Sequence, residues 1–136
     1  LIMQLGAKVY LASNLETKMF VSEVNNDGTL LCKWFAESTG KAYVHAFNKR
    51  LLITSHRDII KVSTSNIKVG DVFKMKIGSS SCDVVVNEII DDKKVICYWL
   101  SKDSGELEIL PIEISFLSKI SLKLVGNDSG LKMAWV

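Results

Sequence analysis

Few side chains in this sequence have the types and spacing that catalysis or metal binding requires. The two histidines, His45 and His56, do not belong to a His/Cys cluster of the kind that holds zinc. The adjacent carboxylates at residues 91–92 are followed by two lysines, which is typical of a solvated turn, and the serines at residues 79–81 have no neighbouring base motif. We therefore expect a protein that is not an enzyme and holds no metal and no cofactor. A small enzyme is the third and weakest hypothesis.

Binding chemistry is better represented, because aromatic and basic side chains interleave along the first half of the chain. The candidate ligand-binding residues are Tyr10, Phe20, Lys33, Phe35, Lys41, Tyr43, Lys49 and Arg50. Exposed at the rim of a small barrel, such residues bind by stacking and cation–π contact, and they suit single-stranded nucleic acid, whose bases stack while its phosphates meet Lys or Arg. The alternative is that the aromatics complete small cores while the lysines keep sheet edges soluble.

The elements that carry these residues occur twice. Cys32 and Trp34 return as Cys97 and Trp99 at a constant offset of 65 residues, which becomes 64 upstream of a polar loop. A loop tolerates such a slip, whereas in a strand it would turn every following side chain to the other face. We interpret the repeat as a tandem duplication, and alternation along the strands assigns Cys32, Trp34, Cys97 and Trp99 to the structural core.

Short apolar runs between turn signals predict strands throughout. They lie at residues 7–11, 18–24, 29–35, 42–47 and 51–53 in the first copy, and at 72–76, 82–90, 95–100, 107–110 and 116–124 in the second. Residues 25–28, Asn-Asn-Asp-Gly, form a strong hairpin signal, and Pro111 should end its strand or place it on a sheet edge. Residues 58–62 would form an added strand or a docking segment. No window has a helical period, so the pattern predicts an all-β fold.

The run Gly70-Asp71-Val72-Phe73-Lys74-Met75-Lys76, followed by Cys97-Tyr98-Trp99, resembles the YodC-like family, which comprises small uncharacterised bacterial proteins of about one such copy. The first copy is similar around Cys32-Lys33-Trp34-Phe35. In the two copies, Ser13-Asn14-Leu15 and Ser79-Ser80-Ser81 stand where the family carries Gly-Gly-Pro. The resemblance implies a compact SH3-like barrel of about five strands for each copy. It implies no activity, since fold does not determine function.

We therefore expect an all-β protein of two tandem small SH3-like barrels, each of about five short antiparallel strands. Residues 3–62 would form the first barrel, 63–67 a linker, and 68–136 the second barrel with an extra C-terminal strand at 131–135.

Composition limits the setting and the partners. Three cysteines without a Cys-x-x-Cys pair favour a reducing compartment, so the expected location is cytoplasmic. No apolar run is long enough for a membrane span, and the N-terminus lacks a signal-peptide layout, so no membrane partner is expected. Up to Asn66 the chain has eight basic and five acidic residues, and after it nine basic and ten acidic.

The leading functional hypothesis is a non-enzymatic binding or scaffold module that contacts a protein partner through strand edges and rim aromatics. The alternative is nucleic-acid binding by the more basic first barrel.

Overall fold

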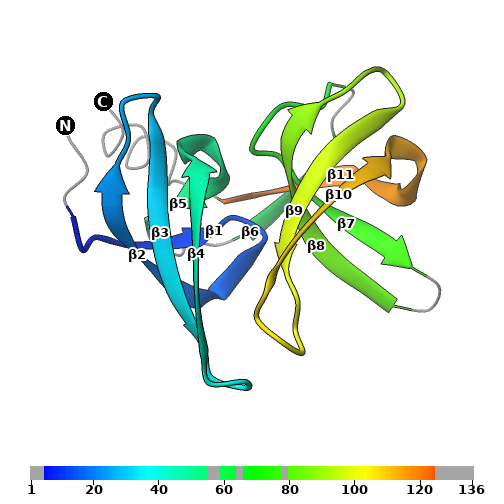
Figure 1. The fold of residues 1–136 in the computed structure, drawn as a ribbon. Helices are drawn as coiled ribbons and strands as arrows, with labels where there is room; N and C mark the ends of the chain where they lie inside the picture. The colour runs from blue at the N-terminus through cyan, green and yellow to red at the C-terminus, as the bar shows by residue number, and fades with distance from the viewer. Residues whose placement is uncertain (1–4, 55–58, 64–65, 78–79, 125–136) are drawn as a thin grey trace.

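The computed structural model describes residues 5–54, 59–63, 66–77 and 80–124, and their regular structure consists of antiparallel strands and two short 3-10 helices. The strands form two sheets, one after the other along the chain (Figure 1). The predicted all-β fold with two small β units is confirmed.

The first unit comprises residues 5–54, and its sheet has the order β4-β3-β2-β1-β5. Its elements are β1 (Lys8–Leu11), β2 (Asn14–Val24), β3 (Thr29–Ala36), β4 (Lys41–Asn48), the 3-10 helix η1 (Lys49–Leu51) and β5 (Leu52–Ile53). The predicted strand at 18–24 starts earlier, at Asn14, which lies opposite Leu11 of β1.

The second unit has the order β10-β9-β8-β7-β11-β6. Its elements are β6 (Ile59–Ser63), β7 (Val72–Ile77), β8 (Ser80–Ile89), β9 (Lys94–Leu100), β10 (Leu107–Glu113), the 3-10 helix η2 (Ile114–Phe116) and β11 (Leu117–Leu124). Apart from β6, the order of strands and the place of the 3-10 helix repeat those of the first unit.

The duplication is preserved in the pairing of individual residues. Val21 lies opposite Cys32, and Val86 lies opposite Cys97, each pair displaced by the same 65 residues. After each pair the register shifts at one residue, Ser22 in β2 and its counterpart in β8. A shared bulge at the same repeat position shows that the two units have one backbone design.

The hairpin at residues 25–28 forms as predicted. The Asn25 N–H donates to the Thr29 carbonyl over 2.9 Å, and Gly28 has a φ of 89°, which is unfavourable for residues with a Cβ. The Asp27 carboxylate accepts from the Thr29 hydroxyl over 2.7 Å and from its N–H over 2.9 Å. Both hydrogen bonds lower the pKa of Asp27, and the one from the hydroxyl has the larger effect.

One segment differs from the expected arrangement. The predicted strand at 58–62 exists as β6, but it pairs with β11 and so belongs to the second sheet and not to the first. For Pro111 the second of the two predicted alternatives is confirmed: β10 runs past it to Glu113 and is an edge strand. The predicted linker starts with the last residue of β6, and its residues 64–65, like the predicted strand at 131–135, lie outside the described residues.

The cores of the two units are joined. The larger core fills the first unit, yet it also contains Val72, Val85 and Leu100 of the second unit. A smaller core inside the second unit consists of Phe73, Met75, Val84, Val86, Val95, Cys97 and Leu117. Because the outer face of the second sheet completes the first core, neither unit buries its apolar surface alone.

Over the described ranges, no helix has the length and apolar character needed to cross a membrane.

Candidate functional site

The turn between β9 and β10 rests on β3 and β4 of the first unit. The indole Nε1–H of Trp34 donates to the Gly105 carbonyl over 2.8 Å, and the Ser38 hydroxyl donates to the Asp103 carbonyl over 2.9 Å. Tyr43 stacks on Trp34 with ring centroids 5.6 Å apart. These contacts fix the two units against each other at one end of their junction.

Aromatic rings of β4 and β9 pack against each other in the junction. Figure 1 shows β4 on the side of the first unit that faces the second. The ring centroid of His45 lies 5.7 Å from that of Tyr98 and 4.9 Å from that of Phe47. Burial lowers the pKa of His45, since the charged imidazolium loses its hydration there. His45 is therefore half-buried, because Tyr98 of the second unit partly covers it.

Backbone also approaches backbone closely between the units. A Cβ added at Gly70 would lie 2.7 Å from the Arg50 carbonyl oxygen, and one added at Gly105 would lie 2.5 Å from the Ala36 Cβ. The counterpart of Gly105 in the first unit, Gly40, has no atom within 4 Å of such a Cβ. The repeated turn is thus used for docking in the second unit only.

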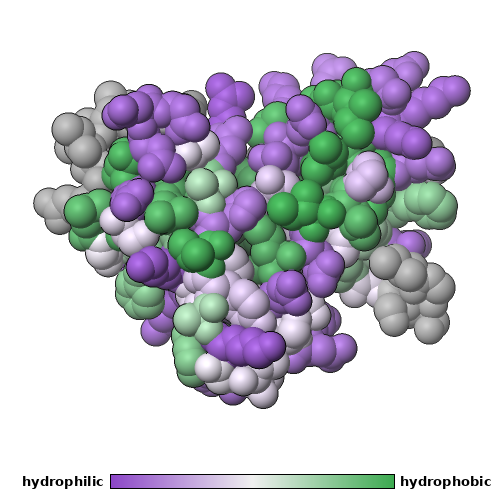
Figure 2. Space-filling view, viewed as in Figure 1, coloured by the Kyte–Doolittle hydropathy of each residue, from purple (hydrophilic) through white to green (hydrophobic). Residues whose placement is uncertain are grey.

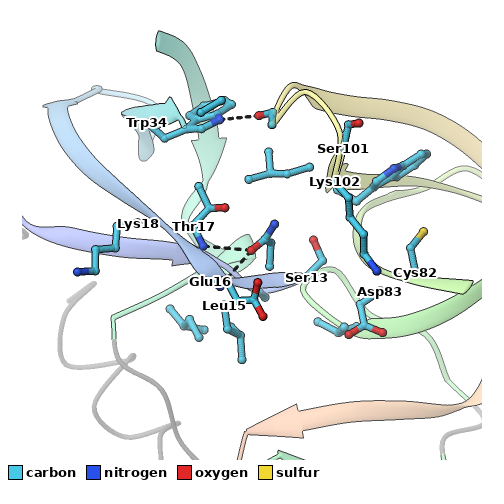
Figure 3. A pocket seen from close by; sticks show the side chains of 18 of the residues that line it. Ser13, Leu15, Glu16, Thr17, Lys18, Trp34, Cys82, Asp83, Ser101 and Lys102 are labelled. Atoms are coloured by element: carbon cyan, nitrogen blue, oxygen red, sulfur yellow. Dashed lines mark hydrogen bonds between the residues drawn. The ribbon is translucent and has the colours of Figure 1, made fainter. Parts of the chain in front are cut away.

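A wide groove of about 1470 Å³ runs between the units. Its walls include segments that correspond in the repeat, 16–18 with 81–83 and 34–37 with 99–102. Figure 3 shows Leu15 and Glu16 on one side and Cys82, Asp83 and Lys102 on the other. The site is therefore built from the same two pieces of each copy, brought face to face by the docking.

The groove carries balanced charge. It is lined by four acidic and four basic residues, Glu16, Glu37, Asp71, Asp83, Lys18, Arg50, Lys74 and Lys102. Lys74 and Asp83 form an ion pair of 3.1 Å, and the buried Asp71 accepts from the Lys68 N–H over 3.0 Å. Apolar contact is available from Phe20, Phe35 and Trp99.

The three thiols differ in access. Cys32 and Cys97 are buried in the two cores, and burial raises the pKa of each to about 12. Cys82 is only partly buried and lines the groove. Within the described ranges, no group of three His, Cys, Asp or Glu side chains is arranged to hold a metal ion.

The structure does not gather the predicted ligand-binding residues on one surface. Tyr10 is buried in the core, because β1 lies between two strands and is covered on both faces. Tyr43 faces inward against Trp34. Lys41 is exposed at the start of β4, Lys49 is half-buried in η1, and Arg50 lines the groove.

Three of the predicted binding residues lie side by side on the first sheet, and two of them, Phe20 and Phe35, also line the groove with Arg50. Phe20 in β2 pairs directly with Lys33 in β3, and Phe35 follows two residues later on the same face of β3. All three are exposed on the outer face of the first sheet.

Among the four predicted core residues, Cys32, Trp34 and Cys97 are buried, and Trp99 is half-buried at the groove. Cys82, Asp83 and Lys102 were not predicted as site residues. Their positions depend on docking, which the sequence does not reveal: the apolar run at 84–86 is typical of a strand covered on both faces, but its counterpart at 19–21 is also apolar and has one exposed face.

Comparison of this chain with protein-family models, with curated proteins and with solved structures finds no match.

Proposed function

We propose that this protein is a non-enzymatic binding module of two SH3-like barrels, which holds an extended segment of a partner protein in the groove between them. The barrel assignment is supported by the strand order β5-β1-β2-β3-β4 with a 3-10 helix before β5, and by its repetition in the second unit. The YodC-like resemblance agrees with such units of about five strands.

The groove itself carries the proposal. Its volume of about 1470 Å³ exceeds the roughly 300–1,000 Å³ of small-molecule pockets, so it suits a polymer segment better than a metabolite. Aromatic side chains offer apolar contact. The carboxylates and the Lys and Arg side chains can pair with charged groups of either sign on a peptide.

Charge favours protein over nucleic acid as the occupant of the groove. A nucleic-acid site needs an excess of Lys and Arg to neutralise phosphates. Here four carboxylates offset four cations, and Asp83 is already paired with Lys74. A location in a reducing compartment such as the cytoplasm completes the proposal, since all three cysteines are free thiols.

Peptide selection combined with blocking of Cys82 tests the proposal. Peptides from a random displayed library would be selected on the whole protein, and their affinities measured by fluorescence polarisation before and after alkylation of Cys82 with a bulky maleimide. We expect alkylation to weaken binding by at least roughly 10-fold, because the adduct occupies the groove.

The Cys82→Ser variant is the matched control. Treated with the same maleimide, it should bind the selected peptides as the untreated protein does. Selected peptides that bind with the same affinity before and after alkylation of Cys82 would place the site elsewhere. A failure to select any peptide would overturn the proposal.

A further inference from the structure

The outer face of the second sheet is covered by the first unit. Its covered residues are Val72, Val85, Tyr98 and Leu100, from three adjacent strands. Tyr98 contacts the rings of His45 and Phe47, and its carbonyl accepts from the Ser13 hydroxyl over 3.2 Å. This face is the docking face of the second unit.

Among the described residues, the same face of the first unit has exposed side chains and no unit packed on it. The repeat counterparts of the docking residues are Lys8, Phe20, Lys33 and Phe35. Phe20 is 49% exposed and Phe35 is 58% exposed, although both are large apolar side chains. We call these four residues the vacant docking face.

The surface that receives the second unit also has an uncovered counterpart. In the first unit, the receiving residues are Trp34, Tyr43, His45, Phe47 and Leu51. Their counterparts in the second unit are Trp99, Glu108, Leu110, Ile112 and Phe116. Leu110 is 48% exposed and Phe116 is 56% exposed, and we call this set the vacant receiving surface.

We propose that a second copy of this chain covers these surfaces, with the vacant docking face of one copy seated on the vacant receiving surface of the next. The contact inside the chain shows how one unit packs on its repeat counterpart. Within the described residues, the first unit does not use its docking face and the second unit does not use its receiving surface. Because the two halves are different surfaces, the association is head-to-tail and produces a closed ring or an open chain of units.

Charge complementarity supports this occupant. Three lysines lie on or beside the vacant docking face, Lys8, Lys18 and Lys33, and their counterparts in the covered face are Val72, Asp83 and Tyr98. The vacant receiving surface carries Glu108, with Glu113 at the same edge strand, whereas the occupied one has Tyr43 and Asn48 there.

Opposite charges therefore appear on the two surfaces that would meet between chains. On the second sheet, the counterpart of Lys18 is Asp83, and its charge is already paired with Lys74 of the same unit. Charges on surfaces that meet select the partner and its register.

Sedimentation velocity over a range of protein concentrations tests the inference. The docking variant is Phe20→Ser with Phe35→Ser, and the receiving variant is Leu110→Ser with Phe116→Ser. All four side chains are about half exposed, so both variants should keep the circular dichroism spectrum of the original protein. We expect the original protein to associate as its concentration rises and each variant alone to stay monomeric.

Mixing the two variants is the decisive step. The docking variant retains an intact receiving surface, and the receiving variant retains an intact docking face, so an equimolar mixture should form a dimer and nothing larger. A control variant, Val24→Ser with Ile89→Ser, removes side chains that are each 45% exposed elsewhere and should associate as the original does.

Charge reversal checks the register. Lys33→Glu should weaken association by at least roughly 10-fold, and combining it with Glu108→Lys should restore it.

A protein that stays monomeric at every concentration, or variants that do not dimerise when mixed, would overturn the inference. Monomers that bind single-stranded oligonucleotides through Lys33 would instead assign the face to nucleic acid. Phe20, Phe35 and Trp99 also line the groove, whereas Leu110 and Phe116 do not. The variant Leu110→Ser with Phe116→Ser should therefore abolish association and leave peptide binding in the groove unchanged, which separates the two results.

Discussion

Burial divides the three thiols into one accessible and two inert groups. Cys32 and Cys97 occupy the same repeat position in two different cores, whereas Cys82 lies at the groove. Burial, and then the carboxylate of Asp83, raises the pKa of Cys82, although less than burial raises that of the core thiols. Reactivity should follow this order, because the thiolate is the nucleophile.

We predict that a small maleimide labels the folded protein once, at Cys82, and labels all three cysteines in urea. The rate at Cys82 should still be rising at pH 9, since its pKa lies above the ordinary value. Mass spectrometry of tryptic peptides locates the adducts. Labelling of Cys32 or Cys97 in the folded protein at a rate similar to that of Cys82 would contradict the buried positions.

His45 makes the junction sensitive to pH. Burial favours the neutral imidazole in the folded protein and lowers its pKa, so below a pH of about 6.5 the unfolded chain binds the proton more readily. The contribution of His45 to stability is therefore complete above that pH and decreases as the pH falls toward the lowered pKa.

The urea midpoint should then fall between pH 7.5 and pH 5 more steeply in the original protein than in His45→Leu, which carries the residue found at the equivalent position in β10. Both proteins would carry His56→Gln, so that the other histidine does not contribute. Parallel pH curves for the two proteins would show that His45 is not responsible.

At the scale of elements, the two β-hairpin turns at Gly40 and Gly105 form a matched pair. Both glycines have a φ of 71°, a conformation that costs a residue with a Cβ about 1–2 kcal/mol. Only at Gly105 would the Cβ also meet the other unit, 2.5 Å from the Ala36 Cβ.

Gly40→Ala should therefore lower the free energy of unfolding by about 1–2 kcal/mol, and Gly105→Ala by clearly more, because the turn must also withdraw from Ala36. Urea denaturation of the two variants measures the difference, which reports on docking alone. Equal losses would mean that the turn at Gly105 adjusts without cost.

Most strands could be predicted from sequence because their signals are local. The hairpin at 25–28 and the alternation of Leu30, Cys32 and Trp34 determine both position and facing. What failed depends on distant neighbours: β6 pairs with β11, far along the chain, and Tyr10 is covered on the face that alternation would expose. Local pattern does not contain those partners.

The candidate site could not be predicted, because it arises only when the two units dock. Glu16 and Asp83 belong to different copies, and neither stands in a motif. Local pattern does not separate the two copies here, because Met19-Phe20-Val21 and Val84-Val85-Val86 are both apolar on both faces of the strand, yet Phe20 is exposed and Val85 is buried.

For the whole molecule, the joined core predicts a single cooperative unfolding transition. Val85 and Leu100 are buried by the first unit, so unfolding of one unit exposes apolar surface of the other. Trp34 and Trp99 provide a natural reporter in each unit.

In a Trp135→Phe background, Trp34→Phe and Trp99→Phe each leave one of these reporters. In each protein, the urea transition seen by tryptophan fluorescence should coincide with that seen by far-ultraviolet circular dichroism. A fluorescence change that precedes or follows the loss of circular dichroism in either protein would show that the units unfold separately.

The bulge shared by β2 and β8 is what duplication of one unit would leave, but the two copies are no longer independent. Val85, Tyr98 and Leu100 would be exposed if the second unit were produced by itself, and the first unit needs them to close its core. Deletion of either copy would therefore leave the other with uncovered apolar surface. Mutations can change the two copies separately, but selection must retain both of them.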